Sequence, residues 1–261
     1  MPGINVSLKN GVGHVTISNP TKFNAMTPDM WQELPRCVAE LDADSSVRVI
    51  VLVGDGDKAF VSGADISGFA TDRAGAEAQS RYSALVSAAY RAPASASKPV
   101  IAQIRGICMG GGLGLALGCD IRICSDDARF RMPAARLGLG YSDADLRRFV
   151  ALIGTQNTYD IFYTARTFDA QDALRMGYVL RVVPAAALAS EVDALAAGIA
   201  KNAPLTLRAV KLSVNGALKD IEEDPTAPEA QAAIDACNQS RDCQEGARAF
   251  LEKRAPQFQG H

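Results

Sequence analysis

Histidine is scarce in this sequence, and several other features that would point to a function are missing as well. The 261 residues include only two histidines, His14 and His261, so chemistry built on a histidine base is a poor prediction. Lys and Arg number 27 against 29 Asp and Glu, a net charge of −2, which gives no electrostatic case for nucleic-acid binding. Aromatic residues make up 6% of the chain, too few to indicate a stacking platform.

Long apolar runs and paired cysteine spacings are also lacking. No stretch of about 18 uncharged apolar residues occurs, so we expect no membrane span. The first residues show no basic segment followed by an apolar one, so we expect no secretory signal and a cytoplasmic protein. The six cysteines are scattered without C-x-x-C spacing. We therefore expect free thiols in a reducing cytoplasm and no zinc.

The sequence does contain strand patterns that alternate with helical ones. Residues 4–19 alternate around Asn10-Gly11, which predicts a hairpin. Thr27 precedes a helical segment that opens with Pro28, a combination typical of a helix N-terminus. Short apolar, β-branched runs predict further strands at 47–53, 99–104, 120–124 and 178–183. This order predicts an α/β fold with parallel strands and crossover helices.

From about residue 184 the pattern is helical only. No strand pattern separates the successive amphipathic segments of this region. We therefore predict a strand-rich N-terminal core and a helical C-terminal part.

A run of glycines, "RGICMGGGLGLALGCD" at residues 105–120, follows a predicted strand and opens a helix. A dinucleotide fingerprint would need a third, spaced glycine, and a phosphate loop would need a lysine after the glycines; both are missing. Close packing of helix on strand explains the small residues without any ligand. An oxyanion hole is the other interpretation, because glycine lets a substrate carbonyl approach an unpaired backbone N–H.

An oxyanion hole needs a second N–H donor from elsewhere in the chain. The segment "KAFVSGADISGF" at 58–69 follows the predicted strand 47–53 and places Gly63 and Ala64 in a loop. Two loops at strand ends, each with small residues, could therefore converge on one oxygen atom.

These segments carry a resemblance to a known family. "AFVSGADI", "KPVIAQIRGICMGGGLGLALGCDIRICSDDARF", "FDAQDALRMGYVLRVV" and "GARAFLEKR" occur in an order that resembles the enoyl-CoA hydratase/isomerase (crotonase) superfamily. The resemblance implies a spiral of ββα turns over residues 1–195 and a helical trimerisation region over 196–261. It also implies an acyl-CoA thioester as substrate, with coenzyme A entering as part of the substrate and no separate cofactor. The assembly it implies is a homotrimer or a dimer of trimers.

The resemblance also implies roles for particular residues. The amides of Ala64 and Gly111 would polarise the thioester carbonyl and stabilise an enolate. Residues expected along the acyl-CoA site are Lys22, Ala25, Ser62, Gly63, Asp65, Ile66, Gly110, Gly114, Ala134, Phe250 and Lys253. Phe250 and Lys253 would reach a CoA, including that of a neighbouring subunit, although Lys253 equally fits a solvated helix face.

Two acids expected from this resemblance are absent. Hydratases of the superfamily carry glutamates in the patterns G-G-G-x-E and A-x-F-x-x-P-E, and this chain has Gly114 and Ala134 at those positions. Adding water across a double bond needs groups that activate the water and handle a proton. The substitutions therefore argue against ordinary hydration by two glutamates.

Polar residues after Pro133 are candidates to replace the missing acids. Asp143 is the leading acid/base candidate because related enzymes place an aspartate close to this position, and Tyr141 is the next. Ser142 or Asp143 could instead be the N-cap of the helix that follows. Asp145 is a third acid/base candidate, although we favour for it the role of a first-turn carboxylate that complements the helix dipole.

Three functions remain open on the sequence. The first is a crotonase-type lyase or isomerase that uses Asp143 or Tyr141. The second is a related decarboxylase, C–C bond hydrolase or dehalogenase. The third is a CoA-binding member without catalysis, which would explain the loss of both acids.

Overall fold

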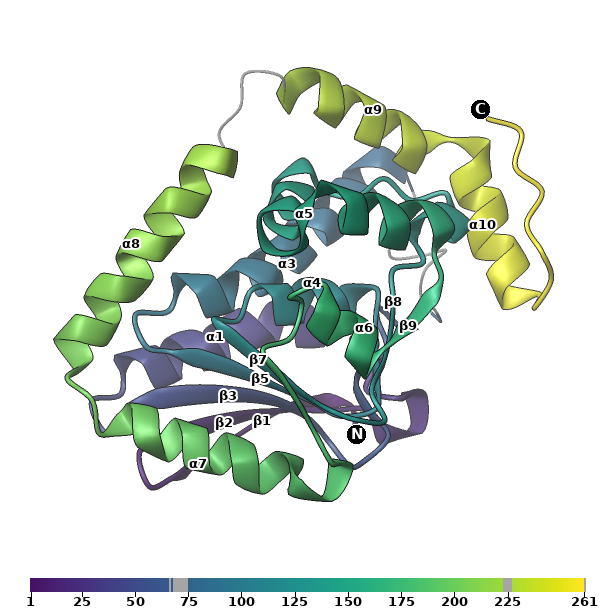
Figure 1. The fold of residues 1–261 in the computed structure, drawn as a ribbon. Helices are drawn as coiled ribbons and strands as arrows, with labels where there is room; N and C mark the ends of the chain where they lie inside the picture. The colour runs from purple at the N-terminus through teal and green to yellow at the C-terminus, as the bar shows by residue number, and fades with distance from the viewer. Residues whose placement is uncertain (66, 68–74, 223–226, 261) are drawn as a thin grey trace.

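The structure is a computed structural model that describes residues 1–65, 67, 75–222 and 227–260 (Figure 1). The chain begins with the predicted hairpin of strands β1 (Gly3–Lys9) and β2 (Val12–Ser18), which pair antiparallel. Asn10 and Gly11 between them have φ of 53° and 78°. Positive φ at both turn residues matches the right-handed twist of a hairpin, which explains the Asn-Gly pair.

Within the described residues, six strands form the main sheet in the order β1-β2-β3-β5-β7-β10. From β2 onward all neighbours pair in parallel. The added strands are β3 (Val49–Gly54), β5 (Val100–Ile104), β7 (Ile121–Ser125) and β10 (Arg181–Val183). Each predicted strand is confirmed, although β10 is shorter than its apolar run.

Helices cover both faces of the main sheet, which explains the uninterrupted apolar run of β3. Ile50 and Leu52 belong to the large core, whereas Val49 and Val51 pack with residues of helix α7 (Leu188–Ala200) on the opposite face. A parallel strand buried on both faces loses the alternation of polar and apolar residues.

A smaller sheet was not predicted from the sequence. Within the described residues it has four strands, in the order β4-β6-β8-β9. Their bounds are β4 (Ala59–Val61), β6 (Ile107–Met109), β8 (Arg129–Arg131) and β9 (Thr167–Asp169). The chain visits the main sheet, the smaller sheet and a helix in turn, so β3-β4, β5-β6 and β7-β8 form successive ββα turns of a spiral.

Helices α1, α3, α4 and α5 lie on one side of the main sheet and α7 on the other (Figure 1). Their bounds are α1 (Pro28–Ala43), α3 (Gly75–Ser95), α4 (Gly111–Leu117), α5 (Asp143–Thr164) and α6 (Ala170–Arg175). Short 3₁₀ turns are η1 (Pro20–Lys22), η3 (Ala134–Leu137) and η4 (Ala185–Ala187). The N-cap predicted at Thr27 is confirmed, because its hydroxyl accepts from the Met30 N–H at 3.3 Å.

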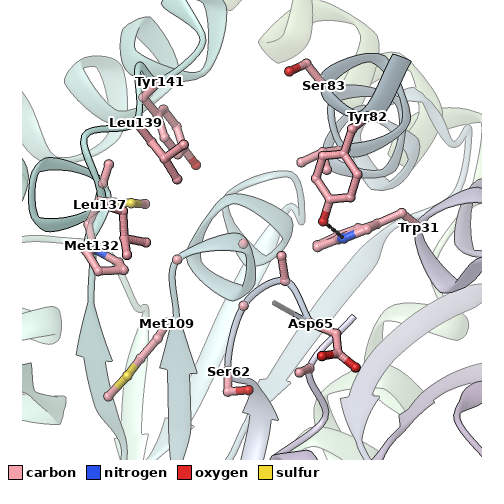
Figure 2. A pocket seen from close by; sticks show the side chains of 18 of the residues that line it. Trp31, Ser62, Asp65, Tyr82, Ser83, Met109, Met132, Leu137, Leu139 and Tyr141 are labelled. Atoms are coloured by element: carbon pink, nitrogen blue, oxygen red, sulfur yellow. Dashed lines mark hydrogen bonds between the residues drawn. The ribbon is translucent and has the colours of Figure 1, made fainter. Parts of the chain in front are cut away.

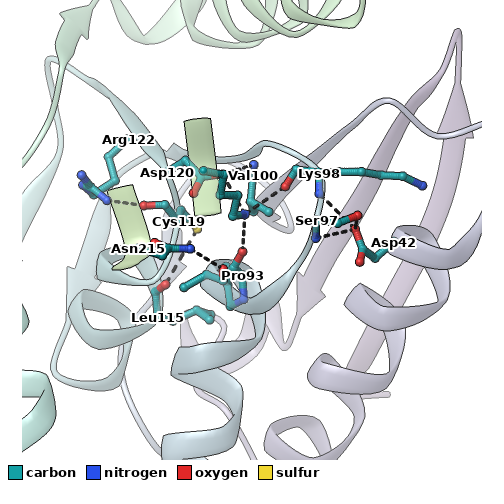
Figure 3. Close-up of polar contacts among 12 residues, drawn as sticks. Asp42, Pro93, Ser97, Lys98, Val100, Leu115, Cys119, Asp120, Arg122 and Asn215 are labelled. Atoms are coloured by element: carbon teal, nitrogen blue, oxygen red, sulfur yellow. Dashed lines mark hydrogen bonds and ion pairs between the residues drawn. The ribbon is translucent and has the colours of Figure 1, made fainter. Parts of the chain in front are cut away.

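Helix α4 is short, and a buried arginine supports its C-terminal end. The Arg122 guanidinium donates to the Cys119 carbonyl oxygen at 2.6 Å (Figure 3). It also donates to the Ala116 carbonyl oxygen at 3.3 Å. Its Nε also donates to the Tyr178 carbonyl at 2.6 Å. A cation at the last carbonyls of a helix satisfies acceptors that have no partner within the helix. Arg122 therefore fixes the helix whose first residue is Gly111.

The C-terminal region is helical, as predicted. It contains α8 (Pro204–Glu222), α9 (Ala227–Gln239) and α10 (Arg241–Leu251), which run around the outside of the core (Figure 1). Helix α7 runs across the division expected between residues 195 and 196 and packs on the main sheet. The division into two regions stays a prediction.

A buried lysine joins α8 to the core. The Lys211 ammonium donates to the carbonyl oxygens of Pro93 at 2.7 Å and Lys98 at 2.9 Å, and to the Asp120 carboxylate at 2.9 Å. Figure 3 shows this region, where Asn215 of α8 also lies over the end of α3. All six cysteines are free thiols. Among the described helices, none has the length and apolar character needed to cross a membrane.

Candidate active site

A pocket of about 650 Å³ opens between helix α3 and the segment that leads from η3 into α5 (Figure 2). Strands β4 and β6 end at its floor. Most of the residues expected along an acyl-CoA site line it: Lys22, Ala25, Ser62, Gly63, Ala64, Asp65, Gly110, Gly111, Ala134, Tyr141 and Phe250. Among the described residues, Gly114, Asp143 and Lys253 are not part of the lining. Ile66 lies outside the described residues.

The two predicted glycine loops converge on this floor. Gly63 follows β4 with φ of +117°, and a Cβ built on it would lie 3.8 Å from the Gly111 nitrogen. Gly110 has φ of +49°, and its Cβ position lies 4.0 Å from the Gly63 Cα. The positive φ favours glycine at both positions, and the two distances show that the loops lie in van der Waals contact. The loops after β4 and β6 therefore bring the backbone at Ala64 and Gly111 together.

Backbone hydrogen bonds hold the Ala64 loop in place. Met26 N–H donates to the Gly63 carbonyl at 2.9 Å, and Asp65 N–H donates to the Met26 carbonyl at 2.8 Å. Gly111 is the first residue of α4, where N–H groups have no partner within the helix. Over the described part of the chain, neither the Ala64 nor the Gly111 N–H donates to a backbone carbonyl. Two neighbouring residues at the pocket floor thus have N–H groups without a backbone acceptor in the described part of the chain.

Aromatic side chains occupy the place where a residue-114 side chain would lie. A Cβ on Gly114 would be 2.4 Å from the Tyr90 ring and 2.7 Å from the Tyr141 hydroxyl oxygen. Contacts below 3 Å cannot be relieved without moving one of these rings. The site therefore has no room for an acid at this position, and two phenol side chains stand there instead.

Tyr141 presents a buried hydroxyl group to the pocket. Its ring contacts Phe162 and Phe149 edge-to-face, with centroids 5.0 Å and 6.1 Å away. The hydroxyl oxygen is buried and has no hydrogen-bond partner within the described residues. Burial raises the pKa of Tyr141 well above its usual range, and nearby Tyr90 and Asp145 add to the rise. Tyr141 is thus a neutral hydrogen-bond donor at neutral pH and not a base.

The aspartates after Pro133 lie in different surroundings. The Asp143 carboxylate accepts a hydrogen bond from Arg147 Nε at 2.8 Å, an ion pair one helical turn apart. Ser142, not Asp143, is the N-cap of α5, and its side chain makes no capping bond. Asp145 is 8% exposed and lines the pocket. Asp145 lies in the first turn of α5, as expected for a carboxylate that complements the helix dipole, and it lines the pocket as well.

A charged group lies at the opposite rim of the pocket. Lys22 donates to the Asp65 carboxylate at 2.8 Å and to the Ser67 hydroxyl at 2.9 Å. Burial alone would raise the pKa of Asp65, but hydrogen bonds from Lys22 and Ser67 outweigh it and lower this pKa below its ordinary value. Asp65 is therefore ionised and holds Lys22 at the rim, where an anionic ligand group could meet the ammonium.

Helix α10 closes the pocket on the side of η3. A Cβ on Gly246 would lie 2.5 Å from the Leu137 carbonyl group, and one on Gly138 would lie 2.8 Å from the Asp242 backbone. These two glycines let α10 pack directly on the segment that carries Leu137. Phe250 of α10 reaches the pocket, and Lys253 follows just after the helix with φ of 54°.

Sequence reasoning missed the helical wall of the pocket. Trp31 of α1 and Tyr82 and Tyr90 of α3 line it, and the Trp31 Nε1 donates to the Tyr82 hydroxyl at 3.1 Å (Figure 2). The signal in the sequence was the helical spacing of α3 residues that face one side: Gln79, Tyr82, Ser83, Val86, Ser87 and Tyr90. Such spacing also describes an ordinary buried face, so it did not single out a site.

The comparison with known proteins identifies the family. A family model described as "Enoyl-CoA hydratase/isomerase" matches residues 7–261.

The chain belongs to the enoyl-CoA hydratase/isomerase family.

Relatives of this enoyl-CoA hydratase/isomerase family member are named for different reactions. The chain is 33% identical to the short-chain-enoyl-CoA hydratase of Clostridium acetobutylicum over 93% of its own length and 92% of the relative's. It is 34% identical to the crotonyl-CoA hydratase of Syntrophomonas wolfei, again over 93% of its own length and 92% of the relative's. A solved structure of methylmalonyl-CoA decarboxylase in complex with 2-nitronate-propionyl-CoA superposes with a TM-score of 0.90 at 26% identity, covering 99% of this chain and 98% of that one.

The predicted crotonase-type α/β fold is confirmed by these likenesses. Over the described part of this family member, no group of three or more His, Cys, Asp or Glu side chains is placed to hold a metal ion.

Proposed function

We propose that the protein binds an acyl-CoA thioester with its carbonyl oxygen between the amides of Ala64 and Gly111. These donors strengthen their hydrogen bonds as negative charge develops on that oxygen, which stabilises an enolate. One such donor contributes on the order of 10²–10³ in rate. The convergence of the two loops supports this proposal.

The reaction that the pocket favours is loss of carbon dioxide from an acyl-CoA that carries a carboxylate on its α-carbon. The observation behind this proposal is the pair of tyrosine rings at Gly114. Hydration and isomerisation both need a base to move a proton, and the tyrosines leave no room for the first glutamate. Decarboxylation forms the same enolate by breaking a C–C bond, so it needs no base.

In this scheme the C–C bond to the carboxylate breaks and its electrons pass to the thioester, giving carbon dioxide and an enolate held by the two amides. The Tyr141 hydroxyl donates a hydrogen bond to the substrate carboxylate before cleavage and keeps it oriented. A proton from solvent then completes the product at the α-carbon. The apolar surroundings of Tyr141 favour the step because they stabilise neutral carbon dioxide better than a carboxylate. The methylmalonyl-CoA decarboxylase likeness supports this choice.

Hydration of a 2-enoyl-CoA is the second candidate. Asp145 favours it, because this carboxyl group lines the pocket and could serve as a base in place of the missing glutamates. The hydratase names of relatives at 33% and 34% identity support it as well.

One substrate panel tests both candidates. The purified protein is incubated with malonyl-CoA, methylmalonyl-CoA and crotonyl-CoA, and thioester products are followed by mass spectrometry together with loss of the enoyl absorbance. Decarboxylation without hydration is the expected result. Hydration of crotonyl-CoA without release of carbon dioxide would replace the first candidate by the second. A comparison of Tyr141→Phe with Asp143→Asn then separates the two predicted polar residues, and the geometry favours Tyr141.

We also propose that the protein assembles as a homotrimer or a dimer of trimers in the cytoplasm. Exposed apolar side chains on α8 support an assembly: Leu205, Val210, Leu212 and Val214. The free thiols are consistent with a reducing compartment. Light scattering coupled to size-exclusion chromatography gives the subunit number, and a monomer at working concentration would contradict the assembly.

A further inference from the structure

We propose that Tyr90 is a specificity-determining residue that limits the size of the substituents on the α-carbon of the acyl group. The inference rests on the proposed binding of a thioester at Ala64 and Gly111. It does not depend on which reaction follows, because it concerns which acyl groups fit.

Tyr90 lies directly beside the proposed oxyanion hole. Its hydroxyl oxygen is 3.3 Å from the position of a Cβ on Gly111, the residue whose N–H would bind the thioester oxygen. The ring of the same side chain lies 2.4 Å from a Cβ position on Gly114, one turn further along α4. Tyr90 therefore covers the first turn of α4. The α-carbon is bonded to the carbonyl carbon, so its substituents must lie close to this ring.

The Tyr90 ring is held in this place by its neighbours. Trp31 contacts it edge-to-face with centroids 5.8 Å apart. Trp31 is itself fixed by the hydrogen bond from its Nε1 to the Tyr82 hydroxyl at 3.1 Å. Exposure is 0% for Trp31, 5% for Tyr90 and 6% for Tyr82. Side chains buried this closely cannot move aside for a larger ligand without disturbing one another.

Glycine at 114 and tyrosine at 90 therefore act as a pair. The absent side chain at 114 makes space for the ring, and the ring fills space that would otherwise belong to the pocket. Shortening Tyr90 to alanine would return that space to the ligand, next to the carbonyl group. Tyr90→Phe removes the hydroxyl but leaves the ring, so it separates the size of the side chain from its polarity.

Two isomeric thioesters test the inference. Hexanoyl-CoA and 2-ethylbutanoyl-CoA have the same acyl composition and differ in branching at the α-carbon, and both are saturated and carry no carboxylate that could be lost. Dissociation constants for both, and for free CoA, are measured by calorimetry on the full chain. Wild type and Tyr90→Phe are expected to bind the linear isomer at least about tenfold more tightly, and Tyr90→Ala to bind both within about threefold.

The outcomes separate the two proposals. Unchanged discrimination in Tyr90→Ala, with free CoA bound as in wild type, would overturn the role of Tyr90 alone. Absence of binding by all three ligands to wild type would overturn both proposals. Tyr90→Leu serves as a second shortened variant in case Tyr90→Ala does not fold, and it is expected to give an intermediate ratio. Equal binding of the two isomers by wild type would also contradict the inference.

Discussion

The ring of Tyr90 stands where a side chain on Gly114 would have to lie, 2.4 Å from its Cβ position. The Tyr90 ring on α3 and a side chain at position 114 on α4 would therefore occupy the same space. Any change at residue 114 has to be read together with residue 90.

Gly114→Ala is expected to destabilise the protein by about 1–3 kcal/mol, because the added methyl overpacks a rigid aromatic cluster. The free energy of unfolding in urea measures this. In a Tyr90→Ala background the same change is expected to cost much less. Gly198→Ala is the matched control: nothing lies within 4 Å of its Cβ position, and alanine there should stabilise α7 by roughly 0.5–1 kcal/mol. Equal costs of Gly114→Ala in both backgrounds would show that the two residues do not compete for space.

Tyr141→Phe is expected to separate stability from activity. The hydroxyl oxygen is buried without a partner within the described residues, so its removal should leave the free energy of unfolding unchanged or raise it by up to about 1 kcal/mol. Turnover of the preferred acyl-CoA is expected to fall by about 10–100-fold, because a hydrogen bond to a charged carboxylate contributes about 1.5–3 kcal/mol. Tyr163→Phe, on a side chain that is 74% exposed, should alter neither quantity. A fully active Tyr141→Phe enzyme would remove Tyr141 from the mechanism.

Asp65 should make part of the stability dependent on pH. Its folded-state pKa is lowered, against the effect of burial, by hydrogen bonds from Lys22 and Ser67. A lowered carboxyl pKa contributes stability that is present above the unfolded-state pKa and is lost as pH falls through the folded-state pKa. The advantage of wild type over Asp65→Asn should therefore be constant above about pH 5 and shrink below about pH 4.

Urea unfolding of both proteins between these pH values measures that advantage. Lys22→Met removes one of the hydrogen bonds that lower the pKa of Asp65, so this pKa should rise. NMR titration of the Asp65 carboxyl carbon measures the rise. An advantage that grows on acidification would contradict the assignment.

Lys211→Met is expected to destabilise the protein by about 3 kcal/mol, because it leaves a partly buried Asp120 carboxylate and two carbonyl groups without their ammonium partner. Burial already raises the pKa of Asp120, and Lys211 opposes that rise. Adding Asp120→Asn to Lys211→Met should restore part of the loss. Lys253→Met, on an exposed side chain, is the control. Limited proteolysis should cut near α8 earlier in Lys211→Met, and an unchanged cleavage pattern would show that this lysine does not anchor the helix.

Much of the fold could be predicted because its main strands and helices are long enough to show a clear periodicity of apolar residues. The β-branched run of β3 predicts a buried strand, and the Asn-Gly pair after β1 predicts a tight hairpin turn. The smaller sheet escaped prediction since strands such as β4 and β9 have three residues, too few for any periodicity to appear. These strands are defined by their neighbours in space.

The candidate site divides in the same way. The convergence of Gly63 and Gly111 was predicted, because small residues at two strand ends indicate a close approach of backbone. Tyr90 was missed because its role depends on the absence of a side chain at Gly114. Asp143 looked free in the sequence, and its pairing with Arg147 appears only once α5 has formed.

Direct contact between α10 and η3 has a mechanical consequence. With glycines at 138 and 246 the two backbones touch, so this wall of the pocket can open only if the C-terminal helix moves with it as one body. Widening on that side would then proceed at the pace of helix displacement, microseconds or slower, and not at the pace of a side-chain rotation. A substitution at Gly246, far along the chain from the loops that carry Gly63 and Gly111, would therefore alter the kinetics of ligand entry.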